Sequence, residues 1–264
     1  MKRLELIVCA KQVPDPEGPA EAFRVDSEAK KVTPEGISPV INPFDENALE
    51  AALRIKDQLD ARVTVLSMGA KLAQPVLRKA LAAGADDLII LMDEQFRDLD
   101  SYSTAYVLSH MIRRLDPFDV ILTGRQAGDW DFGVAGLLIA EMLQIPVINL
   151  ARKVETKDST VLVEKLCDNG YKVVKANMPV LVTVSSEAGE LRYPPVRALV
   201  DAKKKPVKIF NAADLELDLQ QLKVRTIFNL FAFHDVRQCT FAEGESPQEK
   251  AESLVGLMKK GGII

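Results

Sequence analysis

Strands and helices are predicted to alternate through the first half of this chain, and this alternation constrains its fold more than any other feature. Residues 4–10, 63–68, 87–92 and 120–123 are short, almost continuously apolar runs, typical of strands covered on both faces of a parallel sheet. The segments that follow the later runs repeat apolar residues every three or four positions, as helices with one buried face do. Because crossovers between parallel strands are right-handed, the simplest topology is a doubly wound, Rossmann-like α/β sheet.

Further along, the pattern changes to β-like segments without helices, at residues 160–166, 171–175 and 179–184. Asn169-Gly170 separates the first two, and Asn-Gly between two such runs is typical of a tight hairpin. We therefore expect a mostly parallel sheet with an antiparallel β extension, all within one α/β domain over residues 1–225.

The last part of the chain, residues 226–264, is predicted to form a C-terminal helical arm. Residues 247–260 have the spacing of a helix. The segment before them carries apolar side chains that have no partner in the neighbouring sequence, at Phe228, Leu230, Phe231 and Phe233. Because exposed apolar surface of this kind marks interfaces, we expect the arm to pack on a partner subunit.

Composition excludes several classes of protein. There is no uncharged apolar run of the roughly 20 residues that a membrane helix needs, and the first residues lack a signal-peptide pattern, which indicates a cytoplasmic protein. A net charge of −4 gives no reason to expect a nucleic-acid partner. Cys9, Cys167 and Cys239 are odd in number and widely spaced, which argues against a disulfide framework and against a zinc site.

A glycine-rich stretch, residues 123–136, follows the fourth apolar run and precedes another helical segment. Glycine lets backbone approach a ligand closely, and the free N–H groups at a helix start favour an anion such as phosphate. The stretch is neither a Walker A loop nor a G-x-G-x-x-G fingerprint, so its spacing alone is equally compatible with a simple turn. Asp129 and Asp131 are interpreted as caps for the next helix or as partners for a ribose or a cation.

Other loops should meet this stretch, because ligands bind doubly wound sheets at the carboxyl ends of the strands. The first strand ends at Cys9 and Ala10, and Met68 ends the second predicted strand. Asn42 and Asp45 stand just before a helical segment, where either capping or a ligand-facing loop explains them. We expect these residues to share one rim with the glycine-rich stretch.

Taken together, six motifs in order make the chain resemble the beta subunit of electron transfer flavoprotein over essentially its whole length. They are residues 8–14 (VCAKQVP), 41–49 (INPFDENAL), 78–86 (RKALAAGAD), 123–129 (TGRQAGD), 192–194 (RYP) and 202–206 (AKKKP). The resemblance implies an electron carrier subunit without catalytic residues of its own.

In that family the beta subunit forms a heterodimer with an alpha subunit that holds the FAD. Acyl-CoA dehydrogenases reduce this flavin, and a membrane electron transfer flavoprotein:quinone oxidoreductase reoxidises it. The resemblance further implies an AMP in the beta subunit. In electron-bifurcating members a second FAD occupies the AMP site and exchanges hydride with NADH. For this chain we favour AMP over the second FAD.

The resemblance also carries over particular residues. The implied nucleotide contacts are Cys9, Ala10, Asn42, Pro43, Phe44, Asp45, Met68, Gly124, Arg125, Gln126, Ala127, Gly128, Asp129, Asp131, Phe132, Gly133, Val134, Ala135 and Gly136. The implied docking segment for the dehydrogenase is Arg192, Tyr193, Pro194, Pro195 and Val196.

The chain departs from the family pattern in both places. Small polar residues and a glutamine usually follow the Asp-x-Asp turn, whereas here residues 132–136 are Phe-Gly-Val-Ala-Gly. Phosphate would therefore rely on backbone N–H groups. In the docking segment, Val196-Arg197 stands in place of the usual Leu-Pro, which should alter the choice of partner.

Two interpretations from other classes compete with an electron carrier: an adenine-nucleotide-binding hydrolase and a regulatory protein. The hydrolase would need a Ser/Gly-rich phosphate loop after the first strand, and residues 11–16 do not supply one. Lys11 and Arg125 are compatible with phosphate or flavin contact and equally with pairing at a subunit interface. Trp130 is interpreted as a packing residue, with stacking on adenine as the alternative.

Overall fold

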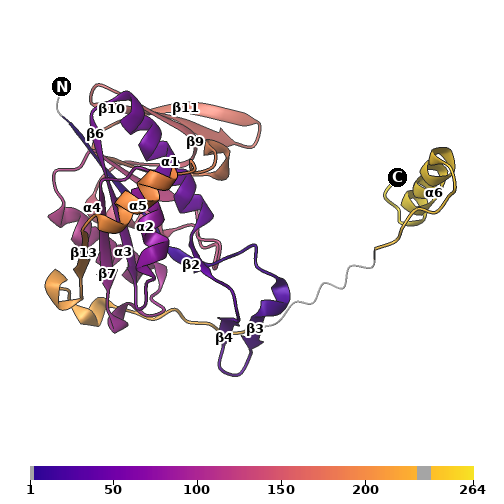
Figure 1. The fold of residues 1–264 in the computed structure, drawn as a ribbon, viewed down its shortest axis with the longest axis horizontal. Helices are drawn as coiled ribbons and strands as arrows, with labels where there is room; N and C mark the ends of the chain where they lie inside the picture. The colour runs from indigo at the N-terminus through magenta and orange to yellow at the C-terminus, as the bar shows by residue number, and fades with distance from the viewer. Residues whose placement is uncertain (1–2, 231–238) are drawn as a thin grey trace.

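The computed structural model describes residues 3–230 and 239–264, and a nine-stranded sheet forms its centre (Figure 1). The spatial order of the strands is β11-β10-β9-β12-β8-β1-β6-β7-β13. The strands are β1 (Leu4–Cys9), β6 (Ala61–Gly69), β7 (Asp87–Met92), β8 (Val120–Gly124), β9 (Val147–Lys157), β10 (Thr160–Cys167), β11 (Gly170–Asn177), β12 (Val180–Val184) and β13 (Val207–Phe210).

The strand order reverses at β1, as a doubly wound sheet requires. From β1 the chain moves outward through β6 to β7, and then returns to β8 on the other side of β1. All pairs from β9 through β12 and β8 to β13 are parallel. The predicted fold class is therefore confirmed. The reversal places the ends of β1 and β8 side by side, with Cys9 paired to Thr123.

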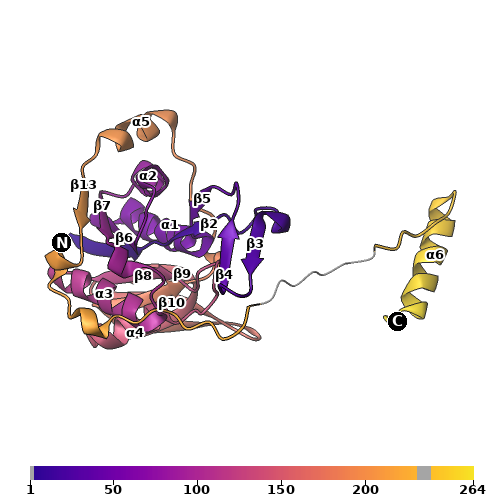
Figure 2. The same ribbon diagram turned by 90° about the horizontal axis from the view of Figure 1, so that it is seen from below.

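Helices cover both faces of the sheet. One face carries α1 (Pro43–Gln58) and α2 (Gln74–Ala83), with α5 (Val196–Lys204) outside α2, and the other carries α3 (Ser101–Arg114) and α4 (Ala135–Leu143), as Figure 2 shows. Leu6 and Val8 of β1 pack in the core on the α1 side, whereas Ile7 and Cys9 pack on the α3 side. Burial on both faces explains why the strand is continuously apolar.

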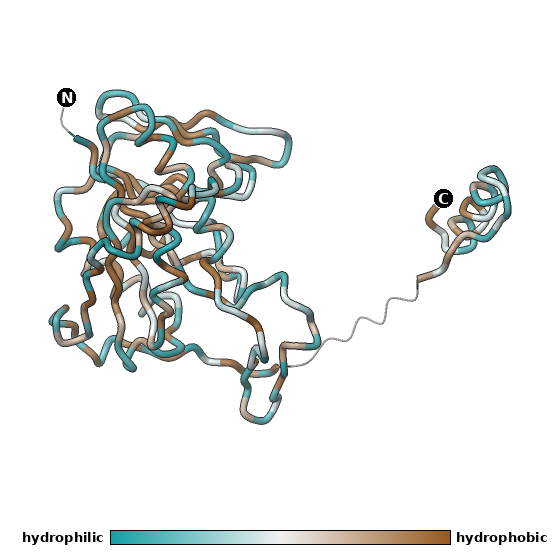
Figure 3. The backbone as a smooth tube through the Cα atoms, in the orientation of Figure 1, coloured by the Kyte–Doolittle hydropathy of each residue, from teal (hydrophilic) through white to brown (hydrophobic). Residues whose placement is uncertain are grey.

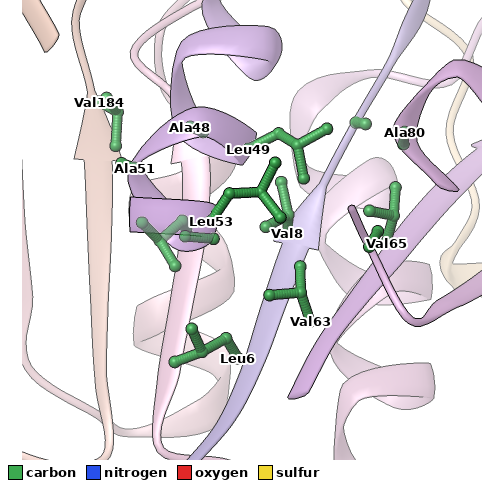
Figure 4. Close-up of a cluster of buried hydrophobic side chains, with 14 of the residues drawn as sticks. Leu6, Val8, Ala48, Leu49, Ala51, Leu53, Val63, Val65, Ala80 and Val184 are labelled. Carbon is green, nitrogen blue, oxygen red and sulfur yellow. The ribbon is translucent and has the colours of Figure 1, made fainter. Parts of the chain in front are cut away.

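The core on the α1 side shows what holds the helix in place. Leu49 and Leu53 of α1 reach down to Leu6, Val8 and Val63 of the sheet (Figure 4), and each of these side chains is at most 2% exposed. Burying one leucine side chain stabilises the fold by roughly 1.5–3 kcal/mol. Over the part of the backbone that the structure describes, apolar segments concentrate in the sheet (Figure 3).

The antiparallel extension contains different strands from those that the sequence predicted. It consists of β9, β10 and β11, and the Asn-Gly hairpin joins the last two as expected. Residues 179–184, which we assigned to the extension, form β12, and this strand pairs parallel with β8 and with β9. Every residue of β12 is buried, so its continuous apolar run is that of a central parallel strand.

Residues 12–41 form an excursion at the carboxyl edge of the sheet. It contains two small antiparallel pairs, β2 (Gln12–Pro14) with β5 (Pro39–Ile41) and β3 (Phe23–Asp26) with β4 (Lys31–Pro34). Short 3-10 turns occur elsewhere, at Ala20–Ala22, Glu94–Phe96, Ser186–Ala188, Ala213–Leu215 and Leu219–Gln221.

The C-terminal helix α6 (Pro247–Lys260) has the predicted bounds and lies apart from the sheet in Figures 1 and 2. Its start is a capping box: the Ser246 hydroxyl accepts from the backbone N–H of Glu249, and the Glu249 carboxylate accepts from the backbone N–H of Ser246. None of its residues is buried. Of the apolar residues expected before it, Phe228 is 81% exposed, and Phe231 and Phe233 lie outside the described residues. Within the described ranges, every helix is too short or too polar to cross a membrane.

Candidate functional site: a pocket where the strand order reverses

A pocket opens at the carboxyl edge of the sheet, between the ends of β1 and β8, the start of α3 and the glycine-rich turn before α4. Its empty volume, opening to solvent included, is about 840 Å³. The predicted residues that line it are Cys9, Ala10, Asn42, Asp45, Met68, Gly124, Arg125, Gln126, Ala127, Phe132, Gly133, Val134, Ala135 and Gly136.

The start of α4 can hold an anion in this pocket. Val134 occupies the N-cap position but makes no side-chain cap. The N–H groups of Ala135 and Gly136 donate no hydrogen bond to any described residue, and both residues line the pocket. Free N–H groups at a helix start favour a negatively charged ligand. The prediction that phosphate would rely on backbone donors therefore has a structural basis.

Asp129 and Asp131 do not cap α4, so the capping interpretation was wrong. The helix begins at Ala135, four residues after Asp131. Asp129 instead accepts from Lys11 Nζ at 2.6 and 2.7 Å, and Asp131 accepts from Gln126 Nε2 at 2.8 Å. Neither aspartate lines the pocket. Their carboxylates set the shape of the turn and are engaged within the protein.

Two of the glycines in the turn are required by the protein itself. A Cβ on Gly124 would lie 2.5 Å from Asp45 Oδ1 and 2.7 Å from the carbonyl carbon of Phe44. A Cβ on Gly136 would lie 2.6 Å from Thr123 Oγ1. Both approaches are much closer than real Cβ contacts allow. Gly124 and Gly136 thus let α1 and α4 pack tightly against β8, which is a different reason from contact with a ligand.

Asp45 and Asn42 join three loops beneath the pocket. Asp45 is 7% exposed and accepts from the backbone N–H of Lys11 at 2.7 Å and of Gly124 at 2.8 Å. Asn42 is 1% exposed; its amide donates to Gln126 O at 2.8 Å and its oxygen accepts from Gly128 N at 3.0 Å. Asn42 is at the N-cap position of α1 but does not cap it. Both side chains therefore cross between loops instead of serving their own helix.

Burial governs the protonation of the two titratable groups at the base of the pocket. It raises the pKa of Asp45 to about 6, and the hydrogen bonds from Lys11, Asn42 and Gly124 offset only part of that effect. Burial, with the nearby charge of Asp45, raises the pKa of Cys9 to about 12. Cys9 is consequently a protonated thiol at neutral pH and packs as an apolar side chain.

Of the remaining predicted residues, Pro43, Phe44 and Gly128 lie beside the pocket without lining it. Pro43 and Phe44 begin α1, and the Arg125 guanidinium lies 5.1 Å from the centre of the Phe44 ring. Gly128 is held by Asn42 as described above. Lys11 and Arg125, whose role the sequence left open, both line the pocket, and Lys11 pairs with Asp129 within this chain.

Sequence reasoning missed one wall of the pocket. Ser101, Thr104 and Leu108 lie on one face of α3 and line it. The signal was present, because α3 follows β7, and β7 ends at the same edge of the sheet as β1 and β8. Leu66 and Ile139 also line the pocket without having been predicted, whereas Thr123 and Trp130 line it as members of the predicted glycine-rich stretch.

The predicted docking segment lies against the outer side of α1. Arg192 donates to Glu50 Oε2 at 3.0 Å and to Asp57 Oδ2 at 2.7 Å. Asn47 Nδ2 donates to Gly189 O at 2.6 Å, just before the segment. Beyond this anchor, Tyr193 is 96% exposed, Pro194 and Pro195 lead into α5, and Val196 is 78% exposed. The segment is thus fixed at its base and presents free side chains at its tip.

Comparison with known proteins agrees with this geometry. A family model described as "Electron transfer flavoprotein domain" matches residues 31–215. The electron transfer flavoprotein subunit beta of Thermoanaerobacterium thermosaccharolyticum is 40% identical over 223 residues, which cover 84% of this chain and 84% of that protein. The caffeyl-CoA reductase-Etf complex subunit CarD of Acetobacterium woodii is 33% identical over 266 residues, or 99% of this chain and 100% of that protein. The acryloyl-CoA reductase electron transfer subunit gamma of Anaerotignum propionicum is 32% identical over 272 residues, with coverage of 99% and 100%.

Fold and pocket first define a class, the doubly wound α/β proteins whose ligand site lies where the strand order reverses. Within that class, the chain belongs to the electron transfer flavoprotein family and groups with its beta subunits. The resemblance inferred from the six motifs is confirmed. The relatives from Thermoanaerobacterium thermosaccharolyticum and Anaerotignum propionicum are named as electron transfer subunits, and CarD is named as a subunit of an Etf complex.

Proposed function

We propose that this chain is the beta subunit of a heterodimer whose alpha subunit holds a redox-active FAD. In this proposal the complex takes electrons from an acyl-CoA dehydrogenase and passes them to a membrane quinone oxidoreductase. The observation that carries the proposal is the pocket at the β1/β8 reversal in a chain of this family. It is lined by Ala135 and Gly136, whose N–H groups have no partner among the residues that the structure describes.

The residues of the pocket fit an AMP. The start of α4 supplies backbone donors for a phosphate, and Leu66, Leu108 and Ile139 supply apolar wall for an adenine ring. AMP contributes no redox chemistry; it would join the glycine-rich turn to α3 and so stiffen this edge of the subunit. The protein's own part is to hold that shape, which Asp45 and Asn42 do from below.

A second FAD in the same pocket is the alternative, as in electron-bifurcating complexes that use NADH. Two observations favour it. The relatives CarD and the acryloyl-CoA reductase electron transfer subunit gamma are named as parts of reductases and not of dehydrogenases. Both match this chain over nearly its whole length. In addition, the pocket is lined by the aromatic rings of Trp130 and Phe132, which are parallel within 19° and could extend an apolar surface for a larger ligand.

Two surfaces suit the partners. The arm of residues 226–264 is proposed to pack on the alpha subunit, because α6 exposes apolar side chains that include Leu254 and Val255, and Ile263 and Ile264 follow it. The docking segment is proposed to receive the dehydrogenase at Tyr193 and Val196. Exposed aromatic and aliphatic side chains of this kind serve as interface anchors.

The cofactor content of the complex tests the proposal. The chain is co-expressed with an electron transfer flavoprotein alpha subunit, the complex is purified, and heat-released nucleotides are identified by chromatography and mass spectrometry. One FAD and one AMP per heterodimer supports the carrier, and two FAD supports the NADH-dependent alternative. A complex that retains no nucleotide beyond the alpha-subunit FAD contradicts both. Failure of the two chains to co-purify contradicts the assignment of the partner.

A further inference from the structure

The segment between β13 and the C-terminal arm crosses the pocket edge of the molecule. We call residues 218–225 the strap. Figures 1 and 2 show the orange chain after β13 running along the edge where the parallel strands end, past α3 and α4. Arg225 is the last residue of the predicted α/β domain, and the arm follows directly.

The strap is attached to the start of α3. Lys223 N donates to Ser103 Oγ at 2.7 Å, and Asp100 N donates to Lys223 O at 2.9 Å. Arg225 N donates to Asp98 O at 2.8 Å, so the strap adds a short antiparallel bridge beside the helix start. Ser103 is fully buried. Its neighbours Ser101 and Thr104 line the pocket, which places the strap behind that wall.

The end of the strap is attached to the opposite wall. The Arg225 guanidinium lies 4.0 Å from the centre of the Trp130 ring and 6.0 Å from that of Phe132. The two rings are stacked with their centres 6.2 Å apart, and both line the pocket. Among the described residues, no carboxylate lies within ion-pair distance of Arg225. Burial lowers the pKa of Arg225, although the charges of Asp129 and Asp98 act in the other direction, so the guanidinium is partly desolvated on the rings.

The strap thus joins the two walls between which a ligand must fit. We infer that it is a latch on the nucleotide pocket: Arg225, acting through Trp130 and Phe132, holds the outer wall against α3, and a bound adenine nucleotide and the docked strap stabilise each other. Arg225 is in this sense a positioning residue, since it is not among the lining residues. The inference rests on the proposed function, because it requires a nucleotide in the pocket.

The latch has a consequence for assembly. Coupling between two sites is reciprocal, so a nucleotide that stabilises the docked strap also fixes the point from which the arm leaves the domain. An occupied pocket should therefore present residues 226–264 from a defined position. The arm would then lose less conformational entropy when the partner subunit binds it, so binding would cost less free energy.

Release rates test the latch. The heterodimer is purified with its bound nucleotides, and loss of AMP and of FAD from the beta subunit is followed by chromatography after transfer to nucleotide-free buffer. R225A should release the beta-subunit nucleotide about tenfold faster, because a partly desolvated cation–π contact is lost. R225K should restore most of the slow release, and R225Q should not. The matched control is R152A, since Arg152 makes a similar contact, 3.8 Å from the centre of the Tyr171 ring, on the antiparallel extension.

Hydrogen exchange supplies a measurement that needs no variant. In the wild-type complex, removal of the nucleotide should speed exchange at the amides of Asp100, Lys223 and Arg225. Equal release rates for wild type, R225A and R152A, or exchange at these amides that is unchanged by nucleotide, would overturn the latch while leaving the proposed function intact. A wild-type complex that holds no beta-subunit nucleotide overturns the proposed function, and the latch with it.

Discussion

Helix α1 carries two sites that are built in opposite ways. Its start lies beneath the pocket, where Asp45 is surrounded by protein and accepts hydrogen bonds from backbone N–H groups. Its middle holds the docking segment, where Glu50, five residues on, is bound by the guanidinium of Arg192. A rigid pocket needs donors and acceptors that do not move, whereas a docking segment needs a fixed base and a free tip.

The net pKa shifts of Asp45 and Glu50 are opposite in direction. Burial raises the pKa of both, but for Glu50 the hydrogen bonds and charge of Arg192 more than offset it, so the pKa of Glu50 is lowered. For Asp45, the hydrogen bonds from two backbone N–H groups and from Asn42, with the charge of Lys11, offset burial only in part, so the pKa of Asp45 is raised to about 6. A charged arginine beside the carboxylate thus decides whether its pKa is lowered or raised. This difference between the two regions can be measured.

The largest expected effect is steric and confined to the pocket. G124A places a Cβ against Asp45 and the backbone of Phe44, neither of which can move without disturbing the other loops. We expect a loss of about 3 kcal/mol of unfolding free energy and loss of nucleotide. G128A is the matched control, because the nearest atoms to its Cβ lie at 3.6 Å. Urea unfolding of both variants checks this, and similar stability for the two would refute the packing role of Gly124.

The second effect is the pH dependence of stability that Asp45 causes. Because the folded pKa of Asp45, about 6, exceeds the ordinary aspartate value of 3.8, its contribution to stability is fully present below about pH 3.8 and is lost as pH rises through about 6. Wild type should therefore gain about 2 kcal/mol relative to D45N between pH 7 and pH 4.5. Urea unfolding of the two proteins at several pH values measures the difference. If the difference in unfolding free energy between wild type and D45N were the same at every pH, the pKa of Asp45 would not be raised by folding.

The docking segment should show the reverse pH dependence and a smaller effect. R192A leaves the 5% exposed Glu50 with only Arg54 as a charged partner, and we expect a loss of about 1–2 kcal/mol at pH 7. Because the folded pKa of Glu50 is lowered, the wild-type advantage should shrink as pH falls below the pKa of an ordinary glutamate. R197A is the control, since Arg197 is 94% exposed and its ion pair is 3.9 Å long. Equal losses for R192A and R197A would show that Arg192 does not anchor the segment.

The smallest expected change in stability comes from the tip of the docking segment. Y193A removes a side chain that is 96% exposed and should alter unfolding free energy by less than about 0.5 kcal/mol. It should nevertheless slow electron transfer from an acyl-CoA dehydrogenase, measured by coupled flavin reduction, because exposed aromatic side chains anchor interfaces. Y171A is the control: it removes a half-exposed tyrosine of β11 and should leave the rate of electron transfer unchanged. Normal transfer with Y193A would place the docking surface elsewhere.

Much of the fold was predictable because it depends on local periodicity. A continuous apolar run and a three-to-four residue repeat each indicate which faces of an element are buried, and so predicted the doubly wound sheet and the rim that holds Cys9, Asp45 and the glycine-rich turn. The position of β12 was not predictable in the same way. Which strand lies next to β8 depends on the path of the chain through the whole sheet, and the antiparallel hairpin beside it biased the assignment.

The roles of individual side chains at the site were less predictable. Asp129 and Asp131 have the residue type of helix caps, yet one pairs with Lys11, which is 118 residues away in sequence. Asn42 stands at the N-cap position of α1, yet it binds Gln126 and Gly128. Capping propensity is local, and a distant partner overrides it when the fold brings that partner within hydrogen-bond distance.

The sequence by itself predicted the strands and helices of the doubly wound half, the hairpin at Asn169-Gly170, the C-terminal helix, the edge of the sheet where the pocket lies, and the family. It did not predict strands β9 and β13. Only the tertiary structure decided that α3 supplies a wall of the pocket, that Asp45 is held by backbone and Glu50 by an arginine, and that Arg225 lies on Trp130. Periodicity records how each segment divides its residues between core and solvent. Which distant groups then meet depends on strand order, and that order is set by the packing of the whole chain.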